Sequence, residues 1–300
     1  MSYFLVKRAG ILSTIQDIGR FGYKDIGITQ SGAMDELAYN WCNKLLQNPH
    51  NTPLLEITYG DFEIESFGNT TFAFCGGEVD IFLNNQKINL WQTYSINRGD
   101  ILRVKFLKRG VRVYFGVSGG FIDKKVLGSY SVSIKEEIKR ALKKEDKLFF
   151  KENKTFLKRF LKRELIPKYP NFLELRVVLG YESELFLKKE IESFFNEIYE
   201  IKSHSRMGYI FRANEGVFSS KIEIISNPIA FGAIQITKSG EPIVLLKEHQ
   251  TIGGYPKIGS VIDIDCFRLS QLKEGDRVKF RLIELKEAIA ISKKFHSFFV

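Results

Sequence analysis

Hydrophobic and polar positions form short alternating runs over most of the chain, and this pattern predicts strands. Between residues 54 and 120, runs rich in Ile, Phe, Val and Thr are separated by Gly-Asp, Gly-Gly and Asn-Asn turn sequences. Similar runs return at 173–180, 198–203, 221–226, 232–240, 241–246, 260–265 and 277–285. Short strands at regular spacing are typical of antiparallel barrels or sandwiches. We therefore expect a mainly β protein.

A few segments depart from this pattern and predict peripheral helices. Residues 34–46 carry apolar side chains at helical spacing, at Leu37, Ala38, Trp41 and Leu45. Residues 183–196 are predicted as a second helix, and the charged segment 133–163 has helical character. Asp35 lies at the start of the first helix, where a capping carboxylate is favoured whether or not it does chemistry.

Pro167 and Pro170 mark the best candidate for a domain boundary, and we divide the chain into domains 1–166 and 167–300. A local repeat supports two related halves. Residues 97–102 and 273–278 both place a Gly-Asp turn before an outgoing strand, and 144–148 is a weaker third copy. The repeat favours a duplicated barrel.

Composition and charge narrow the class of protein. A chain of 300 residues with 44% hydrophobic composition can bury a substantial core. The net charge of +10 is concentrated at 135–168, where both signs are mixed, so a solvated face is favoured over a nucleic-acid surface. No run is apolar enough for a signal peptide or membrane span. We expect a cytoplasmic protein with neither nucleic-acid nor membrane partners.

Three cysteines, Cys42, Cys75 and Cys266, lie far apart with no metal-binding spacing. We expect buried free thiols and no protein-built metal site. Cys75 and His249 are predicted to be structural or incidental.

The stretch 14–35 carries the strongest signal for a site. It holds Gln16, Asp17, Arg20, Ser31 and Asp35, with glycines between them. Glycines allow tight folding, so the backbone amides can approach a ligand. Ser31 lacks a nucleophile elbow and a nearby histidine, which disfavours a nucleophilic role.

A second stretch, 248–258, again sets glycines beside polar and cationic groups. Its members are Gln250, Gly253, Gly254, Tyr255 and Lys257. Consecutive glycines can form an anion-binding nest of backbone N–H groups. We expect the two stretches to form the walls of one pocket that receives an anion.

The motifs together resemble one family. Its marks here are TIQDIGRFGY, SGAMDELAYNWCNKLLQN, LLEITYG, YFGVSGG, VLGS, SRMGY, GAIQITKSGEPIVLL, QTIGGYPKIGSV and LSQLKEGDRVKF, in the family's order. The chain resembles the C component of 5-oxoprolinase, a family also called KipI antagonist, allophanate hydrolase subunit 2 or biotin-dependent carboxyltransferase family protein.

The resemblance implies two cyclophilin-like β-barrel domains and an ATP-dependent opening of the 5-oxoproline lactam to glutamate. The implied partners are a KipI-like B component and a separate lactam-utilisation A component. Other members belong to urea carboxylase and transfer carboxyl groups from biotin, which another protein would have to carry here. A third alternative is a non-catalytic antagonist that binds a KipI-like kinase inhibitor.

Within that reaction we predict two sets of site residues. Cations suit phosphate and carboxylate, glutamines suit an amide, and Asp17 or Asp35 suits a general base or Mg²⁺ ligand. The catalytic set is Asp17, Arg20, Asp35 and Lys257. The set for substrate or nucleotide is Gln16, Ser31, Arg206, Gln235, Gln250, Gly253, Gly254 and Tyr255. Buried ion pairs and a plain helix cap are the structural alternatives. The expected cofactor is ATP with Mg²⁺, although no Walker A loop occurs.

Two departures from the family pattern bear on activity. Ser205 stands where the family has an acid, and residues 131–146 contain no glycine where the family has a glycine-rich stretch. We expect these differences to alter specificity or activity if the missing groups shape the ligand site.

Overall fold

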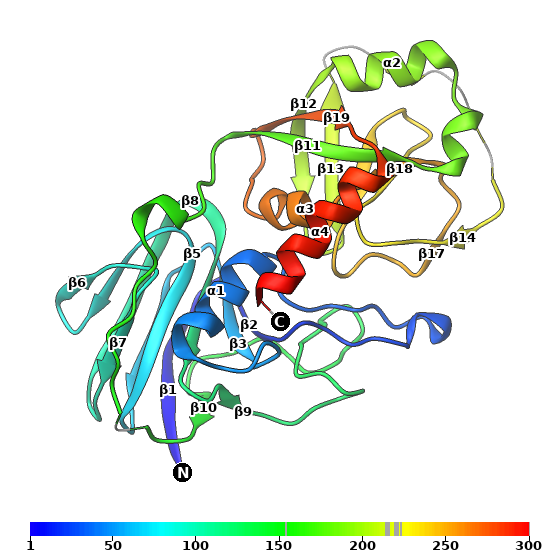
Figure 1. Ribbon diagram of the computed structural model, residues 1–300. Helices are drawn as coiled ribbons and strands as arrows, with labels where there is room; N and C mark the ends of the chain where they lie inside the picture. The colour runs from blue at the N-terminus through cyan, green and yellow to red at the C-terminus, as the bar shows by residue number, and fades with distance from the viewer. Residues whose placement is uncertain (154, 214–216, 219–221, 223, 300) are drawn as a thin grey trace. The chain divides into compact units, whose positions relative to one another are not determined.

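The computed structural model describes residues 1–300 except 154, 214–216, 219–221, 223 and 300. The chain forms two compact units (Figure 1). Unit 1 comprises Met1–Arg20, Ser31–Tyr169 and Phe299, and unit 2 comprises Phe21–Gln30 and Pro170–Phe298. The chain passes from unit 1 to unit 2 after Tyr169, and the domains 1–166 and 167–300 stay a prediction. The assignment of Phe21–Gln30 to unit 2 was not predicted.

Unit 1 is built on a ten-stranded sheet with the order β2-β3-β8-β4-β1-β10-β9, in which β5 pairs with β6, β7 and β8. The strands are β1 Ser2–Ala9, β2 Leu12–Gln16, β3 Leu54–Thr58, β4 Phe62–Ser66, β5 Thr70–Leu83, β6 Gln86–Ile88, β7 Thr93–Ile96, β8 Ile101–Val117, β9 Phe121–Ile122 and β10 Lys147–Phe150. Helix α1, Glu36–Leu46, packs against β5 and β8, and a 3-10 turn covers Arg163–Leu165.

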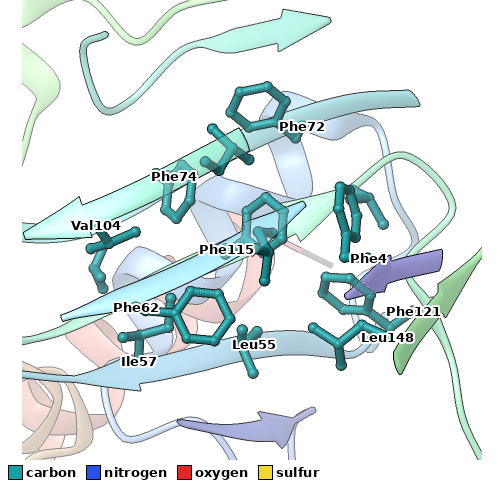
Figure 2. Close-up of a cluster of buried hydrophobic side chains, with 14 of the residues drawn as sticks. Phe4, Leu55, Ile57, Phe62, Phe72, Phe74, Val104, Phe115, Phe121 and Leu148 are labelled. Carbon is teal, nitrogen blue, oxygen red and sulfur yellow. The ribbon is translucent and has the colours of Figure 1, made fainter. Parts of the chain in front are cut away.

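Aromatic packing fills the core of unit 1 (Figure 2). Phe74 and Phe115 stack with ring centroids 4.7 Å apart, and Phe4 meets Phe115 edge-on at 5.5 Å. Strand β3 is buried along its whole length because Leu55 faces this cluster while Leu54 faces the cluster under α1. Its polar residues Glu56 and Thr58 are buried as well.

Unit 2 contains a closed barrel with the order β11-β18-β15-β16-β13-β12-β19 and a separate pair, β14-β17. The barrel strands are β11 Phe172–Leu179, β12 Ile198–His204, β13 Gly208–Ala213, β15 Ala233–Ile236, β16 Pro242–Leu245, β18 Lys257–Val261 and β19 Arg277–Leu282. The pair is β14 Asn227–Pro228 and β17 Ile252–Gly253. The helices are α2 Lys188–Asn196, α3 Asp263–Leu269 and α4 Leu285–Phe299, with 3-10 turns at Lys24–Ile26 and Tyr181–Leu185.

The mainly β prediction is confirmed, and several local predictions need correction. Helix α1 begins at Glu36 with Asp35 as its N-cap, close to the predicted start. The described part of 133–163 contains no α-helix, because its charges follow no apolar stripe and its backbone bonds to the sheet instead. The predicted strand 260–265 ends at Val261 and is followed by α3, and helix α4 was not predicted. The predicted strand 221–226 includes residues outside those described.

None of the helices within the described residues is long and apolar enough to cross a membrane.

The repeated turns found in the sequence share one geometry. In each copy an aspartate carboxylate accepts the N–H of the residue three positions earlier. Asp100 accepts from Asn97 at 2.8 Å, Asp276 from Lys273 at 3.0 Å, and Asp146 from Lys143 at 2.8 Å. The residue before each aspartate has a positive φ, namely Gly99 at 90°, Gly275 at 83° and Glu145 at 73°. The weaker third copy therefore keeps the turn with a side chain in the left-handed region.

Replacing Glu145 by glycine should stabilise the protein. The exposed Glu145 carries the left-handed strain that its two counterparts avoid. We expect Glu145→Gly to raise the free energy of unfolding by about 0.5–1 kcal/mol. This is the strain relieved in the folded state minus the cost of the greater conformational entropy that glycine gives to the unfolded chain. Glu145→Ala keeps Cβ and should leave stability nearly unchanged. Denaturant midpoints that fall with Glu145→Gly would contradict this account.

Candidate functional site

Asp17 is the centre of a buried polar cluster in unit 1. Its Oδ1 accepts hydrogen bonds from Gly19 N at 2.8 Å, Ser129 Oγ at 2.6 Å and Ser131 Oγ at 2.5 Å. Its Oδ2 accepts from Tyr130 N at 2.8 Å. A carboxylate that already accepts four hydrogen bonds is well placed to hold two loops together. The geometry therefore favours a structural role for Asp17.

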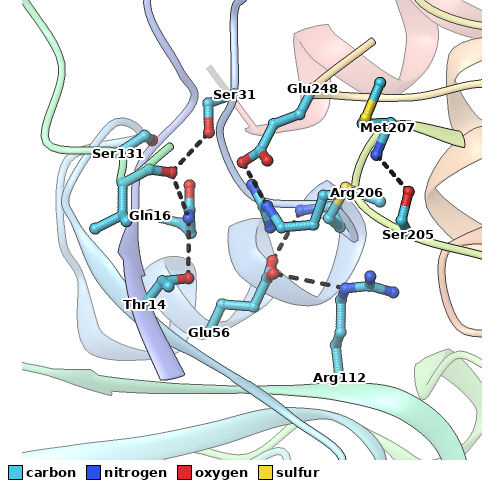
Figure 3. Close-up of polar contacts among 12 residues, drawn as sticks. Thr14, Gln16, Ser31, Glu56, Arg112, Ser131, Ser205, Arg206, Met207 and Glu248 are labelled. Atoms are coloured by element: carbon cyan, nitrogen blue, oxygen red, sulfur yellow. Dashed lines mark hydrogen bonds and ion pairs between the residues drawn. The ribbon is translucent and has the colours of Figure 1, made fainter. Parts of the chain in front are cut away.

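Three other predicted residues meet the same segment of chain, and Figure 3 shows two of them, Gln16 and Ser31. Ser31 Oγ donates to Val132 O at 2.9 Å, and Gln16 Nε2 donates to the same oxygen at 3.1 Å. Arg20 Nη2 donates to Ser131 O. The structure thus brings Gln16, Asp17, Arg20 and Ser31 together around residues 129–133. Gly32 lies against the backbone of Ile18 in this turn. Only glycine fits there, because a Cβ would lie 2.9 Å from Ile18 O.

Asp35 belongs to a different buried network of unit 1. Its Oδ1 caps α1 by accepting from Ala38 N at 3.1 Å, and its Oδ2 accepts from Tyr169 Oη at 2.7 Å. Its own N–H donates to Tyr114 Oη at 2.8 Å, and that hydroxyl donates to Glu56 at 2.6 Å. Asp35 therefore caps helix α1 and also accepts a hydrogen bond from Tyr169.

The two tyrosines of this network keep their protons at neutral pH. Burial first, and the neighbouring Glu56 and Asp35 carboxylates second, raise the pKa of Tyr114 well above its ordinary value. Burial and Asp35 do the same for the pKa of Tyr169. Figure 3 shows Arg112 beside Glu56, with Nε 3.5 Å from Oε1. Both hydroxyls are thus fixed donors to buried carboxylates.

In unit 2, Lys257 is paired with Glu182. Lys257 Nζ lies 3.0 Å from Glu182 Oε1, and Lys257 N donates to Oε2 at 2.6 Å. Asn227 Nδ2 donates to Oε1 at 2.7 Å, and its Oδ1 accepts from Lys257 Nζ. Burial would raise the pKa of Glu182, but the hydrogen bonds from Lys257, Asn227 and Tyr181 lower it. Glu182, the main partner of the predicted cation, was missed in the sequence because it lies 75 positions away.

The other predicted residues of the second stretch gather beside this pair. Gln250 Nε2 donates to Gln235 Oε1 at 3.4 Å, and Gln235 Nε2 donates to Tyr255 O at 3.3 Å. A Cβ at Gly253 would lie 2.8 Å from Gln235 Nε2, so glycine allows this close approach. A Cβ at Gly254 would lie 3.3 Å from Ser226 Oγ. Unit 2 therefore brings these residues together.

Arg206 forms a buried ion pair with Glu248, with Nε 2.6 Å from Oε1. Ser205, where the resemblance led us to expect an acid, accepts from Met207 N at 3.1 Å through its Oγ (Figure 3). The serine thus supports the turn without adding a charge.

Lys24 and His249 form a pair that sequence reasoning overlooked. His249 Nδ1 lies 2.6 Å from Gln250 O and must donate to it, so Nε2 can accept from Lys24 Nζ at 3.2 Å. Burial and then the charge of Lys247 lower the pKa of Lys24. The only signal in the sequence was the position of each residue within a glycine-bearing stretch.

These contacts answer part of the expectation that the two stretches meet. Phe21–Gln30, from the first stretch, belongs to unit 2, and there Lys24 contacts His249 of the second stretch. Arg20 and Lys257 lie in different units, so the pocket shared by them stays a prediction. The described residues hold no group of three or more His, Cys, Asp or Glu side chains placed for a metal ion.

The hydrogen bonds to Glu182 make a testable contribution to stability. Because its folded-state pKa is lowered, the stabilisation is present above the unfolded pKa and is lost as pH falls through the folded value. At pH 7, Glu182→Gln should lower the free energy of unfolding by about 1–3 kcal/mol. The difference from wild type should shrink as pH falls below the ordinary glutamate pKa and should vanish below the lowered folded-state pKa. The exposed Glu184 provides the control, since Glu184→Gln should have little effect at either pH. Equal losses for both variants would contradict the role of Glu182.

Comparisons with known proteins show the family to which this chain belongs. Residues 26–282 match the model of the carboxyltransferase domain, subdomains A and B. The chain is 33% identical to the C component of the 5-oxoprolinase of Haemophilus influenzae and 30% identical to that of Escherichia coli, each over 94% of this chain and 92% of the relative. It is 30% identical to urea amidolyase of Saccharomyces cerevisiae over 90% of this chain but 16% of that protein.

Solved structures share the fold. The crystal structure of TTHA0988 aligns with a TM-score of 0.84 at 26% identity, over 94% of this chain and 55% of that one. The urea amidolyase of K. lactis aligns with a TM-score of 0.86 at 23% identity, over 99% of this chain and 20% of that one. The chain therefore belongs to the family of the carboxyltransferase domain, subdomains A and B, as the sequence motifs predicted.

Proposed function

We propose that this chain is component C of an ATP-dependent 5-oxoprolinase, which opens the lactam of 5-oxoproline to glutamate. The observation that carries the proposal is the match to proteins named as the C component of 5-oxoprolinase, over nearly the full length of both chains. The proposed partners are a KipI-like B component and a lactam-utilisation A component. The three buried free thiols fit a reducing compartment, so we place the complex in the cytoplasm.

The chemistry of the reaction explains which groups are needed. An unstrained lactam resists hydrolysis, and ATP with Mg²⁺ would supply activation by giving its γ-phosphoryl group to the amide oxygen with release of ADP, so that water can open the ring with release of phosphate. The site must then bind a carboxylate, an amide and phosphate groups. Lys257 and Arg206 supply positive charge in unit 2, each beside a carboxylate that fixes its position. Gln235 and Gln250 supply amide groups that can donate and accept.

Unit 1 holds a separate set of candidate groups. Arg20, Gln16 and Ser31 are buried and converge on residues 131–132. In this proposal Arg20 provides a cation, while Asp17 and Asp35 position the chain and do not remove protons. Lys24 and His249 are the better candidates for proton transfer, because the lysine pKa is lowered and the imidazole presents Nε2 to it.

A second function is favoured by one specific observation. The similarity to urea amidolyase covers 90% of this chain, so a carboxyltransferase acting on urea or a related amide is the alternative. Biotin would then be the cofactor and would arrive on another protein.

Reconstitution tests the proposal and separates the two functions. The chain is combined with the A and B components, and glutamate release from 5-oxoproline is followed with and without ATP. We expect ATP-dependent glutamate release that requires this chain. Lys257→Met should lower kcat/KM by about tenfold or more, because a positioned cation is lost. Lys202→Met, which removes an exposed lysine paired with Glu241, is the matched control and should retain activity.

Two outcomes would count against these assignments. No glutamate release, together with carboxyl transfer to urea from a biotinylated carrier, would replace the first function by the second. Glutamate release that is equal in Lys257→Met and Lys202→Met would keep the function but remove Lys257 from the site.

A further inference from the structure

Unit 1 contains a cavity of about 430 Å³ that the proposed function does not use. Its volume lies within the range of small-molecule sites, about 300–1,000 Å³. The lining residues are Gly76, Gly77, Glu78, Leu90, Trp91, Arg109, Ile166, Pro167, Lys168 and Tyr169. They come from β5, β8, the β6–β7 connection and the end of the unit, so distant parts of the chain build one site.

A β-bulge forms one wall of the cavity. The pairing of β5 with β8 shifts register between Gly76 and Glu78. Gly76 has φ +137°, and a Cβ there would lie 2.5 Å from Arg112 O; a Cβ at Gly77 would lie 2.6 Å from Arg109 O. Only glycines permit this close approach of the two strands. Bulges of this kind often occur next to binding sites.

Trp91 forms another wall in a strained conformation. Its φ of 63° is unusual for a bulky residue and costs about 1–2 kcal/mol. Two backbone hydrogen bonds hold it there, from Trp91 N to Phe74 O and from Leu161 N to Trp91 O, at 2.7 and 2.8 Å. Strain that the surroundings maintain is frequently found at ligand sites. Trp91 as a whole residue is 5% exposed and lines the cavity.

The remaining walls give the cavity an apolar body and a cationic side. Leu90, Ile166 and Pro167 are half-buried apolar residues. Arg109 is fixed by a bond from Nε to Tyr169 O at 2.8 Å, and Lys168 is exposed. A guanidinium is a planar fork of N–H donors whose shape suits a carboxylate. Among the lining residues the two cations outnumber the acid, Glu78.

We propose that this cavity binds a small planar ring carboxylate. The ring would lie against the Trp91 indole and the apolar walls, and the carboxylate would pair with Arg109 and Lys168. Stacking on an aromatic face and charge pairing at one edge together select a flat anion over a neutral or aliphatic molecule. The site is distinct in its residues from the groups proposed for lactam opening.

Tryptophan fluorescence tests this site directly. The chain has two tryptophans, so Trp41→Phe leaves Trp91 as the single reporter. Benzoate is the probe, and its neutral analogue benzamide is the matched ligand. In the full-length Trp41→Phe protein we expect benzoate to change the emission of Trp91 in a saturable manner. We expect benzamide to bind at least about tenfold more weakly than benzoate.

Variants of the lining decide between specific and incidental binding. Arg109→Gln should weaken benzoate binding about tenfold or more, whereas Arg103→Gln, on the same strand outside the cavity, should not change it. Ile166→Phe fills the cavity and should also weaken binding, which keeps the test decisive if Arg109→Gln fails to fold. Equal binding of benzoate and benzamide, no saturable change, or unchanged affinity in a folded lining variant would overturn the proposal. Lactam turnover is not read in this experiment, so either proposal can fail without the other.

Discussion

The carboxylate of Asp17 is the constraint on which the first motif depends. Four donors converge on it, from Gly19, Ser129, Tyr130 and Ser131. Asp17 is 3% exposed, so its carboxylate loses its hydration when the protein folds. The four hydrogen bonds compensate for that loss. The same contacts fix the carbonyl groups to which Gln16, Arg20 and Ser31 donate. The polar cluster of unit 1 is therefore arranged around one buried charge.

Unit 2 follows a similar principle with Glu182. This carboxylate fixes Lys257 and Asn227, and Lys257 begins β18 shortly after Gly253 and Gly254. In both units an acid organises the glycine-bearing chain, and the cations and glutamines remain as the groups suited to a ligand. For this reason Asp17 and Asp35, which the sequence suggested as catalytic acids, accept hydrogen bonds from groups of the protein itself.

The β class and the helix after Asp35 were predicted from the periodicity of apolar positions. Gln235, Gln250 and Tyr255 were named as candidate ligand contacts for their chemistry, and the hydrogen bonds among them became visible only in the structure. It could not reveal that Phe21–Gln30 packs with unit 2, since that depends on tertiary contacts. Helical character at 133–163 was wrong because charge was taken as a helical signal without an apolar stripe. Glu182 and Lys24 were overlooked, and His249 was taken as structural or incidental, because their partners lie far away along the chain.

Amide hydrogen exchange in Asp17→Asn is the most direct test of the central constraint. The asparagine keeps the shape but removes the charge and turns one acceptor into a donor. We predict a loss of about 2–4 kcal/mol in the free energy of unfolding, with exchange at Gly19 and Tyr130 accelerated more than in β4. Unchanged stability with both amides still protected would show that the carboxylate does not hold these loops together.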